Sequence, residues 1–304
     1  MKNVWKVLSM MTLSLIIVFG VATVAYAEDD VIDEFAGEPI IVFGAKLSDE
    51  QKEETRKLLN ADNEKVHELL VDGSDLAKYI GGNPNANMYS SVKISFKKAG
   101  HGIVVNITTG DNITEVTSDM YMNALLTAGV ENALVEVASP VKVTGESALT
   151  GIYKAYDATN DDLDPDRMKV ANEELEISTE LADREGVSDE QVASLMAEIK
   201  KALAEKDPVT REEVEEIVKE QLDKLNIELS DADRQLLVDL FDKMKDLDID
   251  FDQIKDQLND IASSIKDKLD DLDIQIDQNF FEKVLDFFKN IFDSIANLFS
   301  SDKD

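Results

Sequence analysis

The hydrophobic pattern of this chain changes near residue 161, and that change constrains the fold more than any other feature. Before it, short apolar or alternating runs such as 39–43, 92–96 and 133–138 are typical of strands, with helical spacing between them. After it, the apolar residues follow the spacing of amphipathic helices. We therefore predict an α+β fold, in which residues 28–160 form a small mixed β-sheet with covering helices and an all-α C-terminal helical region follows.

The centre of the N-terminal part predicts a β-hairpin. Residues 92–96 alternate between apolar and polar, the glycines on either side of His101 suit a turn, and residues 103–107 return as a second apolar run. The polar residues of the first arm would then face water. The predicted order of elements is β-α-α-β-β-α-β-α, which suits a split β-α-β arrangement.

Capping sequences mark the starts of the later helices. Ser188 and Thr210 are each followed three residues later by Gln or Glu, which is the pattern of a capping box. Asp164 precedes a proline, a residue favoured at the first helical position. Residues 161–279 are therefore predicted to form a helical region, with 280–304 as a separate terminal helix.

Residues 1–27 have the layout of a bacterial secretory signal peptide. Two lysines give a basic start, an uncharged apolar stretch follows, and Ala25-Tyr26-Ala27 matches the small-x-small cleavage site. We expect cleavage after Ala27 and hence an exported protein, either extracellular or associated with the cell envelope. A retained N-terminal membrane anchor is the alternative.

The chain is acidic and poor in the side chains used for metal or thiol chemistry. It has a net charge of −33, no cysteine, and only two histidines, His67 and His101. The charge disfavours a nucleic-acid partner. The lack of cysteine excludes thiol catalysis and any cysteine-dependent partner, and two histidines are too few for a three-histidine zinc site. We expect no cofactor and a core that is stable without disulfides.

Several blocks within residues 120–175 resemble one known family. The blocks are MYMNALLTAGV at 120–130, VEVASPV at 135–141, TGESALTG at 144–151, KAY at 154–156 and ANEEL at 171–175. On these blocks the chain resembles the YpuA-like family of uncharacterised exported proteins of Gram-positive bacteria, and the likeness extends from Ile40 to Leu258. The resemblance implies a secreted or cell-envelope location. Because that family is a domain of unknown function, the resemblance implies no catalytic or binding residue.

One short motif has the position of a catalytic serine. Gly145-Glu146-Ser147 lies between a predicted strand and a predicted helix, as does the nucleophile elbow of α/β-hydrolases. That elbow needs a glycine where Leu149 stands, and both histidines precede the serine. We therefore interpret Ser147 as the cap of the following helix. The many carboxylates would permit an acid–base pair, but nothing in the sequence selects two of them.

Acidic residues near the C-terminus follow part of the spacing of a calcium-binding loop. Asp271, Asp273, Asp277 and Glu282 fall at positions 1, 3, 7 and 12 of an EF-hand loop. Position 6 is Ile276, where the sharp turn requires glycine. We interpret these carboxylates as helix caps and solvated faces, and a low-affinity calcium site of the extracellular type is the alternative.

The last predicted helix is unusually rich in phenylalanine. Six of the 20 residues from 280 to 299 are phenylalanine, and they belong to a wide apolar stripe. The helix could dock on the core, or it could contact a membrane surface or a protein partner. The candidate contact residues are Phe281, Phe288, Phe292 and Phe299. Mixed charge on the polar face disfavours anionic lipid.

The sequence as a whole predicts an exported cell-envelope or secreted protein that acts as a non-enzymatic interaction or scaffolding module. No catalytic residue is assigned. Two alternatives stay open: an exported hydrolase that uses carboxylates, and a membrane-surface protein held by residues 280–299. A cleft on the α/β domain that holds two acids within reach of one bond would favour the first, and release from membranes on deletion of the terminal helix would favour the second.

Overall fold

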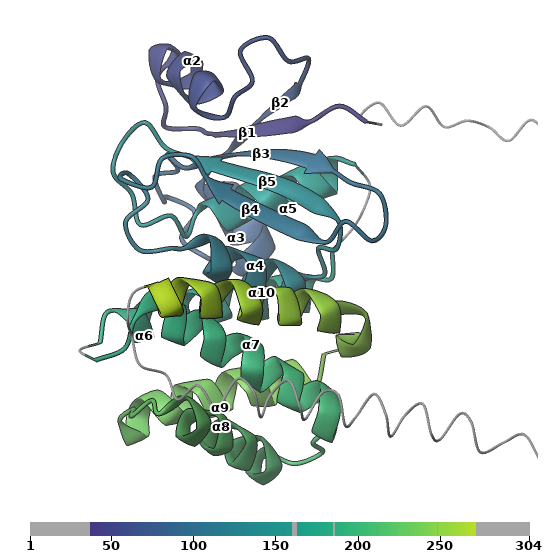
Figure 1. Cartoon of the computed structure of the whole chain (residues 1–304). Helices are drawn as coiled ribbons and strands as arrows, with labels where there is room; N and C mark the ends of the chain where they lie inside the picture. Colours follow the sequence, from purple (N-terminus) through teal and green to yellow (C-terminus); the bar gives the residue numbers. More distant parts are fainter. Residues whose placement is uncertain (1–36, 160–162, 185, 248, 272–304) are drawn as a thin grey trace, which may run out of the picture. The chain divides into compact units, whose positions relative to one another are not determined.

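The computed structural model has the predicted α+β fold, with a β-sheet in the N-terminal part followed, as far as residue 271, by helices (Figure 1). The described residues are 37–159, 163–184, 186–247 and 249–271. The predicted signal peptide and the predicted terminal helix lie outside them. The fold class predicted from the change in periodicity is confirmed.

The sheet has five strands and mixed pairing (Figure 1). The strands are β1 (Ile40–Gly44), β2 (His67–Val71), β3 (Ser91–Phe96), β4 (Ile103–Ile107) and β5 (Ala133–Ala138). Their spatial order is β2-β1-β3-β5-β4. β1 is parallel to β2, β4 is parallel to β5, and β3 runs antiparallel to both of its neighbours. β2 and β4 are therefore the two edges.

The predicted β-hairpin is wrong. β3 and β4 follow one another in sequence, but β5 lies between them in the sheet. The split β-α-β arrangement is also wrong, because each parallel pair consists of direct neighbours. The physical reason lies in β5, which is buried along nearly all of its length and therefore suits a central position better than an edge.

Strand β2 was not predicted at all. Its sequence, HELLV, contains Glu and Leu, which favour helices, and lacks a continuous β-branched run. Glu68 and Leu70 are exposed, whereas Val71 is buried. Pairing with β1 therefore determines this strand, and a local sequence pattern does not reveal such pairing.

Helices cover one face of the sheet. On this face, α4 (Ser118–Ala128) and α5 (Ala148–Ala158) contact the strands, and α3 (Gly73–Ile80) packs against α5. α5 packs so closely on the sheet that a Cβ atom at Gly151 would lie 3.2 Å from a methyl group of Val92 and 3.7 Å from Val42. α4 packs against β4. This side of the sheet is the main core of the N-terminal part.

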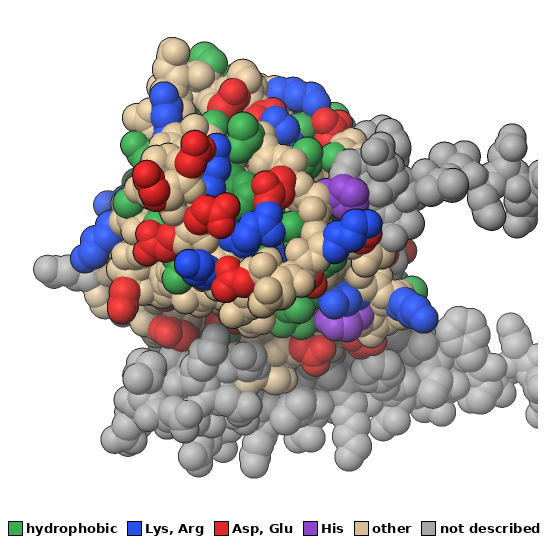
Figure 2. Space-filling model, turned by 90° about the horizontal axis from the view of Figure 1, so that it is seen from above, with side chains coloured by type: hydrophobic (Ala, Val, Ile, Leu, Met, Phe, Trp, Pro, Cys, Tyr) green, Lys and Arg blue, Asp and Glu red, His purple; other side chains and the backbone are tan. Residues whose placement is uncertain are grey.

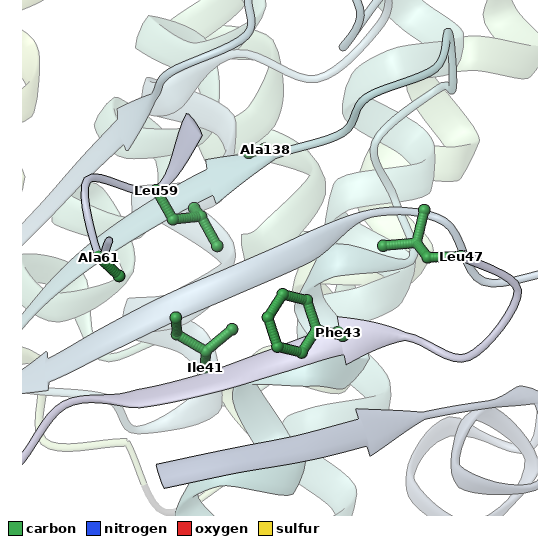
Figure 3. Close-up of a cluster of buried hydrophobic side chains, with 6 residues drawn as sticks. All are labelled: Ile41, Phe43, Leu47, Leu59, Ala61 and Ala138. Carbon is green, nitrogen blue, oxygen red and sulfur yellow. The ribbon is translucent and has the colours of Figure 1, made fainter. Parts of the chain in front are cut away.

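A smaller apolar cluster covers the opposite face of the sheet (Figure 3). Its members are Ile41, Phe43, Leu47, Leu59, Ala61 and Ala138. The segment that begins at the end of α2 (Asp49–Leu58) supplies Leu59 and Ala61. Ser48 caps this helix through a capping box with Gln51, as its sequence indicates. The cluster buries the alternate residues of β1, so both faces of this strand are covered.

The polar face predicted for β3 does not face water. Lys93 is buried and lies directly opposite Glu136 of β5 in the register. Its ammonium group is 2.6 Å from Glu136 Oε2 and 3.3 Å from Glu64 Oε2. The amide of Asn60 donates a second hydrogen bond to Glu136 (3.1 Å). An opposite-charge pair across neighbouring strands explains how this polar row can be buried.

Acidic and basic side chains intermingle on the end of the molecule that carries α2 and β2 (Figure 2). Ion pairs there join Arg56 to Glu68 and Lys65 to Glu38. The strongly negative net charge of the chain therefore does not produce a uniformly acidic surface on this end. We assign no ligand to it.

Helices of the C-terminal part begin at the predicted caps. The helices are α6 (Pro165–Ala182), α7 (Asp189–Lys206), α8 (Arg211–Leu225), α9 (Asp231–Lys245) and α10 (Phe251–Asp271). Ser188 and Thr210 form capping boxes, and Asp164 accepts hydrogen bonds from the first turn of α6. These predictions are confirmed.

The helical part and the sheet share buried contacts. α4 packs against α6, and α10 packs against both α7 and α4. The guanidinium group of Arg167 donates to the backbone carbonyls of Thr127 (2.8 Å) and Leu126 (3.1 Å) at the C-terminal end of α4. A positive charge at this end of a helix is favourable because the last carbonyls lack partners within the helix.

Candidate functional site

Most of the predicted site residues lie outside the described part of the chain. Of the calcium candidates, only Asp271 is included, as the last residue of α10. Asp273, Asp277 and Glu282 are outside, as are the four candidate contact residues Phe281, Phe288, Phe292 and Phe299. Within the described ranges, no three potential metal ligands are grouped to hold an ion, and no helix is long and apolar enough to cross a membrane.

An open groove lies between the edge strand β4 and the helices α4 and α10. Its volume is about 450 Å³, which falls within the usual range of ligand pockets. It is lined by residues 101–106 along β4, by Ser118, Asp119, Met122 and Leu126 of α4, and by Gln257, Asp260 and Ile261 of α10. We call it the β4 groove. Met122, Leu126 and Ile261 give it an apolar part, and the strand gives it a polar wall.

The polar wall consists of backbone groups. The hydrogen bonds at the two ends of β4, from Ala133 to Gly102 (3.1 Å) and from Thr108 to Val137 (2.9 Å), show that its even-numbered residues bond to β5. In a parallel ladder, every second residue directs its N–H and C=O groups to one neighbour. The odd-numbered residues of 103–107 therefore direct theirs to the open edge, and Ile103 and Val105 among them line the groove.

A side chain of α10 already occupies one position on this edge. The Gln257 side-chain oxygen accepts a hydrogen bond from the backbone N–H of Ile103 (2.8 Å). It takes the place that a carbonyl of a neighbouring strand would take. Val105 is the next residue whose backbone groups point to the open edge, and it lies further along the same wall. The groove therefore continues the line along which a further strand would bond.

The charged groups of the groove are mainly acidic. Its lining residues include Asp119, Asp260 and His101, but no lysine or arginine. Asp260 is exposed, whereas Asp119 is buried in the first turn of α4. The His101 Nδ1 atom lies 3.1 Å from the carbonyl oxygen of Gly102, so the ring lies beside the N-terminal end of β4.

Comparison with known proteins places the groove within a matched region. Residues 43–261 match a family described as "Protein of unknown function (DUF1002)". The chain belongs to this family. A Bacillus subtilis (strain 168) relative, "Uncharacterized protein YpuA", is 35% identical over 260 residues, which cover 84% of this chain and 87% of that protein. No solved structure matches significantly.

The DUF1002 region contains both walls of the β4 groove, because the match begins in β1 and ends within α10. Ile261, the last matched residue, itself lines the groove. The resemblance to a YpuA-like family predicted from the sequence blocks is thereby confirmed. The groove was not predicted, since it brings together segments that are about 150 residues apart in the chain.

A buried ion pair between α6 and α7 was also not predicted. Lys200 and Glu174 are both fully buried, and their charged groups are 2.5 Å apart. Lys200 also donates to the backbone carbonyl of Asn123 (2.7 Å), and Thr127 donates to Glu174 Oε2 (2.6 Å). Burial lowers the pKa of Lys200, because the ammonium group loses its hydration. The pair and its hydrogen bonds join α4, α6 and α7, and neither Lys200 nor Glu174 lines the β4 groove.

The Gly145-Glu146-Ser147 motif does not form a capping structure. Ser147 stands at the N-cap position of α5, but it has helical backbone angles and its side chain makes no capping hydrogen bond. Capping residues adopt extended angles instead, so the capping prediction for Ser147 is wrong. Gly145 has a φ of +110°, and its carbonyl accepts a hydrogen bond from Tyr121 (2.5 Å). The motif is therefore a tight turn held by α4.

Glu146 in this turn predicts a pH-dependent stability. Partial burial, with repulsion from Glu176, raises the pKa of Glu146. The folded state then holds its proton to a higher pH than the unfolded state, so stability falls as pH rises above the ordinary pKa, about 4.3. We expect Glu146→Gln to raise the free energy of unfolding at pH 7 and to leave it unchanged near about pH 3.5.

Urea titrations at several pH values would measure this difference. Glu176→Gln is a matched variant, because it removes the repulsion but leaves Glu146 buried; its gain at pH 7 should be smaller. A Glu146→Gln protein that is less stable than the native chain at neutral pH would contradict the argument.

Proposed function

We propose that this protein is exported and works as an interaction module that binds its partner in the β4 groove. The observation that carries the proposal is the groove itself: an edge strand with outward-facing backbone groups, an apolar part and an acidic residue at its rim. Edge strands with free bonding groups readily pair with another chain, and proteins usually cover or blunt them. The signal-peptide pattern of residues 1–27 supports export.

The Phe-rich segment supports a second contact. Residues 280–299 have the spacing of an amphipathic helix with a wide apolar stripe. We propose that this segment attaches the exported protein to a membrane surface or to a protein partner, through Phe281, Phe288, Phe292 and Phe299.

Site-specific photo-crosslinking in cells tests the groove. Benzoylphenylalanine at Asn106, which is exposed at the groove, should give an adduct of one defined mass. The same group at Glu212, exposed in the first turn of α8 away from the groove, is the matched control and should give none. The crosslinked chain should begin at Glu28 if cleavage follows Ala27.

Two results would contradict the proposal. Equal adducts from both positions would mean that the groove has no special role, and absence of any adduct from Asn106 would mean that it is not occupied. Recovery of the chain in the cytoplasm with residues 1–27 intact would refute export while leaving the test of the groove valid.

A further inference from the structure

The β4 groove has the features of a site for an extended peptide rather than for a compact small molecule. The odd-numbered residues of β4 direct backbone N–H and C=O groups to its open side, as the hydrogen bonds at the ends of the strand show. An extended peptide that adds to such an edge satisfies these groups in a regular row. A compact molecule would satisfy one or two of them.

The contact made by Gln257 supports the same geometry. Its amide oxygen accepts from the N–H of Ile103 at 2.8 Å, a distance typical of a ladder hydrogen bond. The edge is therefore already bonded at its first outward-facing residue as it would be by a strand. An added peptide would continue this row at Val105 and Ile107.

The side chains along the groove indicate the kind of residues that such a peptide carries. Val104 is 39% exposed on the outer face of the sheet, whereas Ile103 and Val105 are buried on the side where α4 packs. Every second side chain of an added strand would lie beside Val104, and the others would point toward Met122, Ile261 and Asp260 on the helix side. Apolar residues at every second position are therefore favoured.

Charge complementarity selects the other positions. Asp260 is an exposed lining residue, Asp119 is a buried lining residue at the start of α4, and no lysine or arginine lines the groove. Lys97 and Lys98 belong to the turn before β4, outside the lining. The chain as a whole carries a net charge of −33, which attracts cationic partners over longer distances.

We propose that the β4 groove binds a short extended peptide segment with alternating apolar and basic residues, which adds to the sheet as a sixth strand beside β4. This rests on the proposed role of the groove as the interaction site, and it names the chemistry of the partner. The backbone of the peptide bonds to Val105 and Ile107, and one of its basic side chains lies near Asp260.

Fluorescence anisotropy with defined peptides tests the proposal on the full chain recovered from expressing cells. The probe is a labelled Val-Lys-Val-Lys-Val peptide with blocked ends, and Val-Glu-Val-Glu-Val is its charge control. We expect the lysine peptide to bind at least tenfold more tightly. Two further peptides carry N-methyl groups, one on its odd-numbered and one on its even-numbered residues. Only one of the two should lose binding, because a strand bonds to β4 through every second residue.

Variants of the protein locate the site. Asp260→Asn should weaken binding of the lysine peptide about fivefold, the size of a favourable charge contact of about 1 kcal/mol. Asp256→Asn is the matched control, since Asp256 is exposed on the same helix but does not line the groove. Val105→Pro removes an outward-facing N–H and should weaken binding at least tenfold, while the β4–β5 ladder keeps its bonds.

Several results would overturn the proposal: no binding of the lysine peptide, equal binding of the glutamate peptide, or equal loss in both N-methylated registers. The N-methylated peptides keep the test decisive even if Val105→Pro impairs folding. Failure here combined with a specific adduct from Asn106 in cells would refute the peptide chemistry and leave the proposed function standing. Failure of both would refute both.

Discussion

Replacing Glu174 by Ala should destabilise the protein by about 3–5 kcal/mol, because it leaves the Lys200 ammonium group buried without its counter-charge. That loss is a large share of the total stability of an ordinary domain, about 5–15 kcal/mol. A double variant, Glu174→Leu with Lys200→Met, removes both charges and keeps apolar volume. It should be at least about 2 kcal/mol more stable than the single variant. Urea unfolding followed by circular dichroism would measure all three free energies.

The neighbouring residue provides the control. Glu173 pairs with Lys243 at 2.6 Å, but both side chains are partly exposed. Water screens such a pair, so Glu173→Ala should cost less than about 1 kcal/mol. If Glu174→Ala were no more harmful than Glu173→Ala, the account of the buried pair would be wrong.

Replacing Gly145 by Ala should destabilise the protein by about 3 kcal/mol through strain and overpacking. Its φ of +110° is unfavourable for any residue with a Cβ atom. The added Cβ would also lie 2.7 Å from a methyl group of Ile113 and 2.9 Å from the Tyr121 hydroxyl. Since this hydroxyl donates to the carbonyl of Gly145, the substitution would also disturb the hydrogen bond that holds the turn.

Two other glycines separate these effects. Gly81 has a φ of +73° with open space around it, so Gly81→Ala adds backbone strain alone and should cost about 1 kcal/mol. Gly110 has open space and no positive φ, so Gly110→Ala should change the free energy of unfolding by less than about 0.5 kcal/mol. Urea unfolding of the three variants gives the comparison. Equal losses for Gly145→Ala and Gly81→Ala would show that the crowding has no cost.

Helix starts and the α+β class could be predicted from the sequence because they depend on local chemistry. The capping boxes at Ser48, Ser188 and Thr210 each involve residues three apart, so the sequence contains the whole interaction. The change from strand to helix periodicity near residue 161 is likewise local. The family was also recognisable, because long ordered blocks carry it.

The strand order could not be predicted, because it depends on pairing between distant segments. β5 enters the sheet between β3 and β4 only after the chain has passed through α4. The burial of Lys93 follows from the same pairing, since it places Glu136 opposite this lysine. A local alternation of apolar and polar residues cannot show that the polar side is covered.

The buried ion pair left a signal that could have been recognised. Lys200 follows Met196 by four residues and precedes Leu203 by three, so its spacing places it on the apolar face of α7. A lysine on the buried face of a helix predicts a buried acid nearby. The identity of that acid, Glu174, is not recoverable from spacing, because it comes from a different helix.

The β4 groove contains a natural probe in Met122. It lines the groove and is partly exposed, whereas the other methionines in the described ranges, Met88, Met120, Met168, Met196 and Met244, are buried. An exposed thioether is oxidised by peroxide, and a partner in the groove would shield it. The oxidation rate of Met122 therefore reports whether the groove is occupied.

The most direct test of the central claim is the rate at which dilute peroxide converts Met122 to its sulfoxide, measured by peptide mass spectrometry. The rate would be compared between intact cultures and the purified chain, with a methionine peptide added to both to calibrate the oxidant. An occupied groove predicts a rate several-fold lower in cultures. Equal rates in cultures and in the purified protein would contradict the claim that the β4 groove is the interaction site.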